Sequence, residues 1–203
     1  MPFEISSERR SYMKHEHLLE QMKSRMPEKR FIHTKGVAET ATLLAEMYGE
    51  DSQKAEIAGI LHDSVKYANL DWLRSIIVSE KMNPLLLDFN HELWHAPVGS
   101  YVARTEFQIT DEDILQAIEF HTTGRAGMSK LEKIIYISDM IEPSRKFSGV
   151  ELLREKAKVD LEDAMTSCIQ HSISFLIEKK QPVFPDSFHC YNDLIQQRGK
   201  VKE

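Results

Sequence analysis

A histidine and an aspartate stand side by side at His62 and Asp63, in a segment (55–66) that otherwise has the pattern of a buried helix. Apolar residues recur through it at helical spacing and include His62 in their stripe, so its imidazole is predicted to face the interior. Asp63 lies about 100° further round such a helix, at the border of the apolar face. A buried charge is costly unless it is paired or bound to metal. The pair is therefore either a core histidine satisfied by a backbone carbonyl beside a surface aspartate, or part of a metal site.

Four further residues with metal-binding side chains are predicted to face the interior from other helices or helix ends. They are His33, His95, His121 and Asp139. His33 continues the apolar stripe of a helix expected over 27–48. Asp139 shares a helical face with Leu131 and Ile135. Pro97 suits the first turn of a helix, which leaves His95 just before its start. Each has an ordinary alternative as a core or capping group.

Six such side chains would be costly in a core, but together they suit a metal centre. Four imidazoles and two carboxylates exceed the needs of one tetrahedral ion and fit two ions that share a carboxylate. Asp63 is the expected bridge, because its neighbour His62 is already committed to one ion. The mixed nitrogen and oxygen donors favour iron, manganese, cobalt or zinc over magnesium, and no cysteine ligand lies nearby to indicate a structural zinc site.

Several polar residues close to these ligands can take phosphate oxygens. Lys66, one turn beyond the His-Asp pair, is either a solvated lysine or a group that meets a phosphate oxygen or the leaving group. The loop after His121 offers hydroxyls, backbone amides and a guanidinium, or is an ordinary turn that ends a helix. This loop consists of Thr122, Thr123, Gly124 and Arg125. Arg30 and Arg145 are similar candidates, although Arg145 could instead pair with Glu142.

The elements that must hold these residues are predicted to be helices. The chain has 203 residues with only 8 glycines and 7 prolines, and its apolar residues fall mostly at intervals of three and four. It is long enough to bury roughly 70 % of its unfolded surface in one core. We expect an all-α, single-domain helical bundle over 27–197, an N-terminal helix or extension over 1–26, and a tail over 198–203. The last helices carry enough apolar residues for a homodimer face, or they complete the core.

The composition excludes several kinds of partner. A net charge of -6 and a pI near 5.9 argue against nucleic acid. No run approaches the roughly 18 apolar residues of a membrane span, and the N-terminus has no apolar segment of signal-peptide length. Cys168 and Cys190 are too few for a secreted disulfide scaffold. We therefore expect reduced thiols and a cytoplasmic protein.

The order of the six residues resembles that of the HD-domain metallophosphohydrolase superfamily, which has a histidine, an adjacent His-Asp, two further histidines and a late aspartate. The sequence around them is similar to that of the YqeK family of bacterial symmetrical dinucleoside tetraphosphatases. The matching segments read RFIHTKGV, AGILHDSVK, ELWHAPVG, EFHTTGR and SDMIEPSRKFSGV. The resemblance spans about Arg30 to Leu194. Ser138 stands where alanine is usual, and Trp94 where leucine is more usual; neither is a ligand.

The resemblance implies an all-helical fold, a two-iron centre and hydrolysis of diadenosine tetraphosphate, a dinucleoside polyphosphate, into two molecules of ADP. Asp63 and Lys66 are the expected catalytic residues. One ion would be held by His33, His62, Asp63 and Asp139, and the other by Asp63, His95 and His121.

Other classes of function stay open at this point. A different HD phosphohydrolase would act on a nucleoside monophosphate or a guanosine tetraphosphate alarmone. A sensing module would bind a nucleotide without turnover, and its mark would be the loss of a ligand, but none is missing. A purely structural bundle would need each inward histidine to be satisfied by backbone groups.

Overall fold

The computed structural model of the chain describes residues 17–200. Over that range the chain forms helices and no β-strand, so the predicted all-α fold is confirmed. Residues 1–16 of the expected N-terminal extension and residues 201–203 of the expected tail lie outside the described residues. No helix of the described part is long and apolar enough to cross a membrane.

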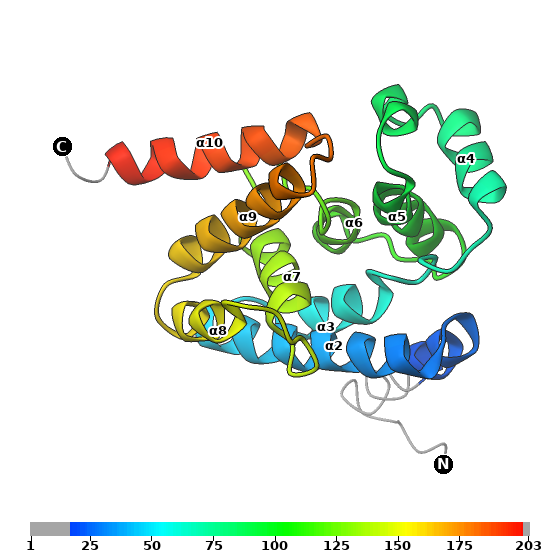
Figure 1. Cartoon of the computed structure of the whole chain (residues 1–203). Helices are drawn as coiled ribbons and strands as arrows, with labels where there is room; N and C mark the ends of the chain where they lie inside the picture. The colour runs from blue at the N-terminus through cyan, green and yellow to red at the C-terminus, as the bar shows by residue number, and fades with distance from the viewer. Residues whose placement is uncertain (1–16, 201–203) are drawn as a thin grey trace, which may run out of the picture.

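Two helices pack closely along one side of the molecule, α2 (Glu28–Tyr48) and α3 (Ser52–Leu61) (Figure 1). Gly49 ends α2 with a φ of 64°, a left-handed conformation that glycine adopts without steric cost. The side chain of Asp51 then caps α3, because its carboxylate accepts hydrogen bonds from the first free backbone amides of that helix. The end of α2 agrees with the helix expected over 27–48.

The remaining helices flank a central pair, α6 (Glu112–Glu119) and α7 (Lys130–Ile141), which pack against each other and against α3 (Figure 1). One flank consists of α4 (Leu70–Ser79), the short 3-10 helices η1 (Pro84–Asp88) and η2 (His91–Leu93), and α5 (His95–Thr105). The other consists of α8 (Val150–Val159), α9 (Leu161–Glu178) and α10 (Pro185–Lys200).

The main core lies around α7. Its Ile134, Ile135 and Ile137 have no exposed surface, because α2, α3, α6, α8 and α9 all pack on this helix. A smaller apolar cluster lies under α4 and α5. Met22 and Met26 belong to the main core, so the described part of the N-terminal segment packs on the bundle. The division of the chain at 26/27 and 197/198 stays a prediction.

Three helix ends differ from the predicted positions. α3 ends at Leu61, so the His-Asp pair follows the helix instead of lying inside it. The next backbone amides bond three residues back, from Ser64 to Leu61 and from Lys66 to Asp63, which makes a tighter turn. α5 begins at His95, which was expected just before the start of that helix, and α6 ends two residues before His121. Periodicity does not separate a last helical turn from a tight turn that follows it.

The contact between α2 and α3 gives a test of the packing. A Cβ added at Gly59 would lie 2.8 Å from the backbone Cα of Ala38, which has no freedom to move aside. We expect Gly59→Ala to lower the free energy of unfolding by about 1 to 3 kcal/mol, measured by urea denaturation. At Gly199 on α10 an added Cβ meets nothing within 4 Å. Gly199→Ala is therefore the control, expected to be neutral or stabilising by up to about 1 kcal/mol; equal effects of both substitutions would contradict this packing.

Candidate metal centre

The six residues singled out in the sequence meet in one site between the helices. They come from α2 (His33), the turn after α3 (His62 and Asp63), the start of α5 (His95), the turn after α6 (His121) and α7 (Asp139). Five of the six are buried, and Asp139 is partly exposed. Residues up to 106 positions apart in the chain are thus brought into one cluster.

Asp63 is the centre of this cluster. Its Oδ2 lies 3.2 Å from Nε2 of His62 and 3.7 Å from Nε2 of His33. Its Oδ1 lies 3.0 Å from Nε2 of His95 and 3.9 Å from Nε2 of His121. The two oxygens of one carboxylate therefore face two different pairs of imidazoles, as a carboxylate that bridges two ions would.

The donor atoms form two groups that could each hold an ion. In each group the ligand atoms all lie within 4.8 Å of one another. The groups are His33, His62 and Asp139, and His62, Asp63 and His121. His95 adjoins the second group, with Nε2 3.1 Å from Nε2 of His121. His62 belongs to both groups, so the assignment of each ligand to one of two ions stays a prediction.

Three of the four imidazoles are oriented in the same way. The Nδ1 atoms of His62, His95 and His121 each lie 2.7 Å from the backbone carbonyl oxygen three residues earlier. A carbonyl oxygen only accepts hydrogen bonds, so Nδ1 carries the proton and donates it. Nε2 is then left with its lone pair toward the site, which is the form of histidine that binds metal.

The residues present fit a metal ion. The Nε2 atoms of His33 and His62 are buried and have no hydrogen-bond partner among the described residues. A buried acceptor left without a partner costs about 1 to 3 kcal/mol, and a cation in the site would satisfy both atoms. Imidazole nitrogens combined with carboxylate oxygens are a donor set suited to first-row transition metals.

The protonation states also suit metal binding. Burial alone would raise the pKa of Asp63, but the imidazoles of His62 and His95 beside it hold that pKa well below its usual value. Burial likewise opposes ionisation of Asp139, yet nearby His33 and Arg145 lower the pKa of that carboxyl group. Burial, followed by the neighbouring histidines, lowers the pKa of His121 to about 3. The site thus offers two carboxylates and a neutral imidazole.

Three predicted phosphate-binding cations lie beside the ligands. Nη1 of Arg30 is 2.8 Å from Oδ2 of Asp63. Arg145 donates from Nη2 to Oδ1 of Asp139 and from Nε to the backbone oxygen of the same residue at 2.7 Å. Nζ of Lys66 lies 3.3 Å from Nδ1 of His95. Positive groups therefore border the site on more than one side.

A pocket of about 680 Å³ adjoins the site and is lined by one of the ligands, His33. Its other lining residues are four cations, two aromatic residues, a glutamate and a serine. They are Lys29, Arg30, Arg145, Lys146, Tyr67, Phe147, Glu142 and Ser144. Four basic side chains around one opening make this pocket locally positive, although the chain as a whole is acidic.

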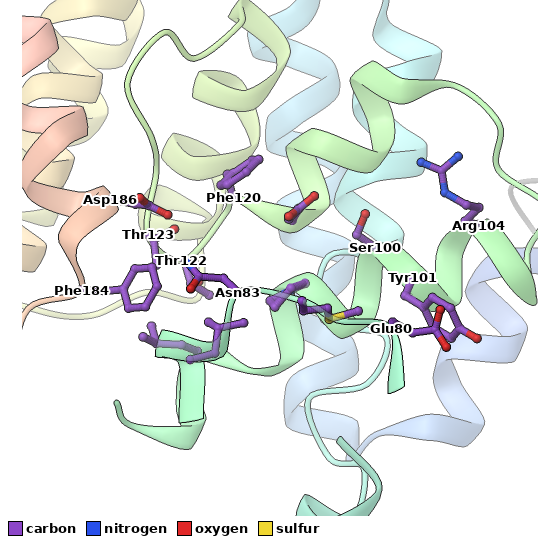
Figure 2. A pocket seen from close by; sticks show the side chains of 15 residues that line it. Glu80, Asn83, Ser100, Tyr101, Arg104, Phe120, Thr122, Thr123, Phe184 and Asp186 are labelled. Carbon is purple, nitrogen blue, oxygen red and sulfur yellow. The ribbon is translucent and has the colours of Figure 1, made fainter. Parts of the chain in front are cut away.

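The loop after His121, which was predicted to bind phosphate, does not face the metal site. Thr122 and Thr123 line another pocket, of about 610 Å³, where they lie near Phe184 and Asp186 (Figure 2). None of the six ligands is among the described residues that line this pocket.

The rest of that loop is engaged within the fold. Arg125 is held by the buried carboxylate of Glu132, at 2.6 and 3.0 Å, and by Gln116. Gly124 has a φ of 63°, and a Cβ there would lie 2.8 Å from Sγ of Cys190. The structure therefore brings Arg30, Lys66 and Arg145 to the ligands, but not the Thr122–Arg125 loop.

Glu142 contacts one of the ligands, and the sequence did not reveal this contact. Oε1 of Glu142, which is 1 % exposed, lies 3.0 Å from Nδ1 of His33. The sequence suggested Glu142 only as a partner for Arg145, whose Nε is 3.9 Å from the same oxygen. Its position three residues after Asp139 was the available signal, because residues three apart lie on one face of a helix.

The fold and the site define an HD-domain protein. The HD domain family matches residues 30–144, more than half of the chain, and this stretch contains all six ligands. The solved structure of a predicted HD superfamily hydrolase involved in NAD metabolism, from Clostridium acetobutylicum, superposes with a TM-score of 0.86. It is 39 % identical in sequence, and the match covers 90 % of this chain and 97 % of that one.

Closely similar relatives narrow the family. A symmetrical bis(5'-nucleosyl)-tetraphosphatase of Bacillus subtilis is 50 % identical over 183 residues, which cover 90 % of this chain and 98 % of the relative. One of Halalkalibacterium halodurans is 47 % identical, covering 89 % and 96 % of the two chains. The chain therefore belongs to the HD domain family and, within it, to the group of the symmetrical bis(5'-nucleosyl)-tetraphosphatases. The resemblance seen in the sequence is confirmed.

The central position of Asp63 predicts how metal content responds to substitution. We expect Asp63→Ala to lose both ions, because its two oxygens face both pairs of imidazoles. His62→Ala should also lose metal, since His62 belongs to both donor groups. Metal per chain is measured by elemental analysis of the purified variants. Asp71→Ala, at an exposed position on α4, is the control; retention of wild-type metal content by both site variants would disprove the centre.

Proposed function

We propose that the protein hydrolyses diadenosine tetraphosphate symmetrically, giving two molecules of ADP, at the centre formed around Asp63. The observation that carries this proposal is the gathering of the six ligands in one cluster, with four imidazoles around the carboxylate of Asp63. The chain is also 50 % identical to a symmetrical tetraphosphatase over 90 % of its length. No ligand is missing, which favours an enzyme over a module that only senses a nucleotide.

We infer that the centre takes two transition-metal ions. We propose iron as the bound metal; manganese, cobalt and zinc also suit these nitrogen and oxygen ligands. The proposed ligands of one ion are His33, His62, Asp63 and Asp139, and those of the other are Asp63, His95 and His121. When bound, such ions polarise a phosphate oxygen and lower the pKa of water, so that a strong nucleophile is available at neutral pH.

The protein's own contribution begins with the position of its donors. Backbone carbonyls hold three imidazoles in place before any ligand arrives, so the site needs little rearrangement. The low pKa of Asp63 keeps its carboxylate charged, and we assign it the role of bridging ligand. These features together support a preorganised site, in which a phosphate oxygen and the attacking water are held near one another.

Arg30 and Arg145 are proposed to bind the phosphate chain. Each already contacts a ligand carboxylate and lines the 680 Å³ pocket. Within residues 17–200 the contacts of Arg145 with Asp139 use Nε and Nη2, which leaves its Nη1 group for a phosphate oxygen. A planar guanidinium suits this double use, because its donors lie in a fixed fork.

Lys66 is proposed to act on the leaving group. Its ammonium is held by Oε2 of Glu92 at 2.6 Å. This places it at the edge of the second donor group, 3.3 Å from the imidazole of His95. An ammonium there would offset the negative charge that develops on the departing ADP.

Several finer assignments stay predictions. A substrate role for Thr122, Thr123, Gly124 and Arg125 would require the substrate to extend beyond the 680 Å³ pocket. A homodimer would use exposed apolar residues of the last helices, of which Phe175 and Ile177 are half exposed or more. We also propose a cytoplasmic location, which the two free, buried cysteines suit.

Product analysis tests the reaction. The protein is loaded with Fe²⁺ and incubated with diadenosine tetraphosphate, and we expect ADP to be the sole nucleotide product by chromatography. Formation of ATP and AMP would show asymmetric cleavage and contradict the proposal. Turnover of a nucleoside monophosphate or of a guanosine tetraphosphate alarmone, without turnover of diadenosine tetraphosphate, would favour another HD phosphohydrolase.

The role of Lys66 is tested separately from metal binding. We expect Lys66→Ala to keep its metal but to lose about ten- to a hundred-fold in kcat, the effect of removing one charge-assisted hydrogen bond from the transition state. Metal analysis and steady-state kinetics on the same preparation give both quantities. Lys158→Ala, on an exposed pair with Glu155, is the matched control. Wild-type kcat in Lys66→Ala would remove this residue from the mechanism.

A further inference from the structure

We propose that Glu142 is a positioning residue for the metal centre, whose carboxylate holds His33 in the tautomer that presents Nε2 to the ions. The inference rests on the proposed metal centre. Oε1 of Glu142 lies 3.0 Å from Nδ1 of His33, and both side chains are buried. A carboxylate accepts the Nδ1 proton, which leaves the lone pair on Nε2.

The place of His33 in its helix explains why it needs such a partner. The other three imidazoles lie at helix ends, where the carbonyl three residues earlier accepts from Nδ1. His33 lies inside α2, where the carbonyl oxygens are used by the hydrogen bonds of the helix. Its Nδ1 therefore takes an acceptor from outside the helix, and Glu142 provides it from the end of α7.

Glu142 is itself held firmly. The backbone amide of Ser144 donates to Oε2 at 2.6 Å, and the hydroxyl of Ser144 donates to Oε1 at 2.5 Å. From α8, Arg154 donates to the backbone oxygens of Glu142 and Ile141, at 2.8 and 2.9 Å. The turn after α7 is thus fixed on two sides, and the carboxylate is oriented toward His33.

Gly36 supports the same conclusion from the other side of the contact. It lies one turn after His33 on α2, and a Cβ there would be 2.6 Å from Oε2 of Glu142. A glycine inside a helix costs about 1 kcal/mol relative to alanine. The absence of a side chain at this position makes room for the carboxylate beside the histidine.

The expected consequence concerns metal affinity. An imidazole whose Nδ1 proton is held by a carboxylate offers a more basic Nε2 lone pair to a metal than one held by a carbonyl. Loss of such a partner weakens metal binding by about ten- to a hundred-fold. The effect should fall on the donor group that contains His33, with His62 and Asp139. The group around His95 and His121 has its own carbonyl partners and should be affected less.

The test is a titration of metal-free protein with Co²⁺, followed by visible absorbance. We expect Glu142→Ala to bind one of two Co²⁺ ions about ten- to a hundred-fold more weakly than the wild type. Glu142→Gln keeps an acceptor oxygen and should recover part of the loss. Glu132→Gln is the matched control, because Glu132 is also a buried carboxylate of α7 but pairs with Arg125; it should bind Co²⁺ as the wild type does.

Gly36→Ala provides a second variant that leaves every carboxylate in place. The atom nearest its new Cβ is the end of a side chain and not backbone, so the fold should persist, as checked by circular dichroism, while the Glu142 carboxylate is displaced from His33. We expect weaker binding of the same ion. Wild-type Co²⁺ affinity in Gly36→Ala and Glu142→Ala, or an equal loss in Glu132→Gln, would overturn the role of Glu142. A wild-type protein that takes up no Co²⁺ would instead refute the proposed centre.

Discussion

The structure depends on one buried carboxylate, that of Asp63, and on the charges gathered around it. A single ionised carboxylate in a protein interior is strongly unfavourable unless other groups compensate it. Here a guanidinium, that of Arg30, and four imidazoles surround it, and they come from α2, the turns after α3 and α6, and the start of α5. Each packing contact among these helices therefore also places a partner for the same charge. The packing of the helices and the assembly of the site therefore depend on the same contacts.

The points at which the helices begin and end also determine how the ligands are oriented. A histidine inside a helix finds its neighbouring carbonyls occupied, whereas one at a helix end finds a carbonyl free to orient it. α3 and α6 end immediately before His62 and shortly before His121, and α5 starts at His95. His33 is the exception inside α2, and it is oriented by a side chain from another helix. The four imidazoles thus have the same tautomer, which a backbone carbonyl fixes in three of them and a carboxylate fixes in His33.

Residue type and spacing were sufficient to predict the helical fold and which side chains lie together. Inward-facing polar residues such as His33 and Asp139 are rare enough on apolar stripes to be recognised. The sequence did not reveal where the chain turns after such a residue. Thr123 faces the second pocket because Ser187 of α10 donates to its backbone oxygen, a contact 64 residues away in the chain. Glu142 was missed as a ligand partner for the same reason, since its role depends on how α7 meets α2.

Local charge, and not net charge, decides what this site can accept. The chain carries -6 overall, yet the basic residues that line the 680 Å³ pocket include Arg30 and Arg145, which reach the ligand carboxylates. Charges separated by more than about 8 Å are largely screened at physiological ionic strength. The distant surface acids therefore oppose a polyphosphate only weakly, while the nearby guanidinium groups attract it at contact distance. An acidic protein can in this way hold a strongly acidic substrate, provided its cations are concentrated where the ligands are.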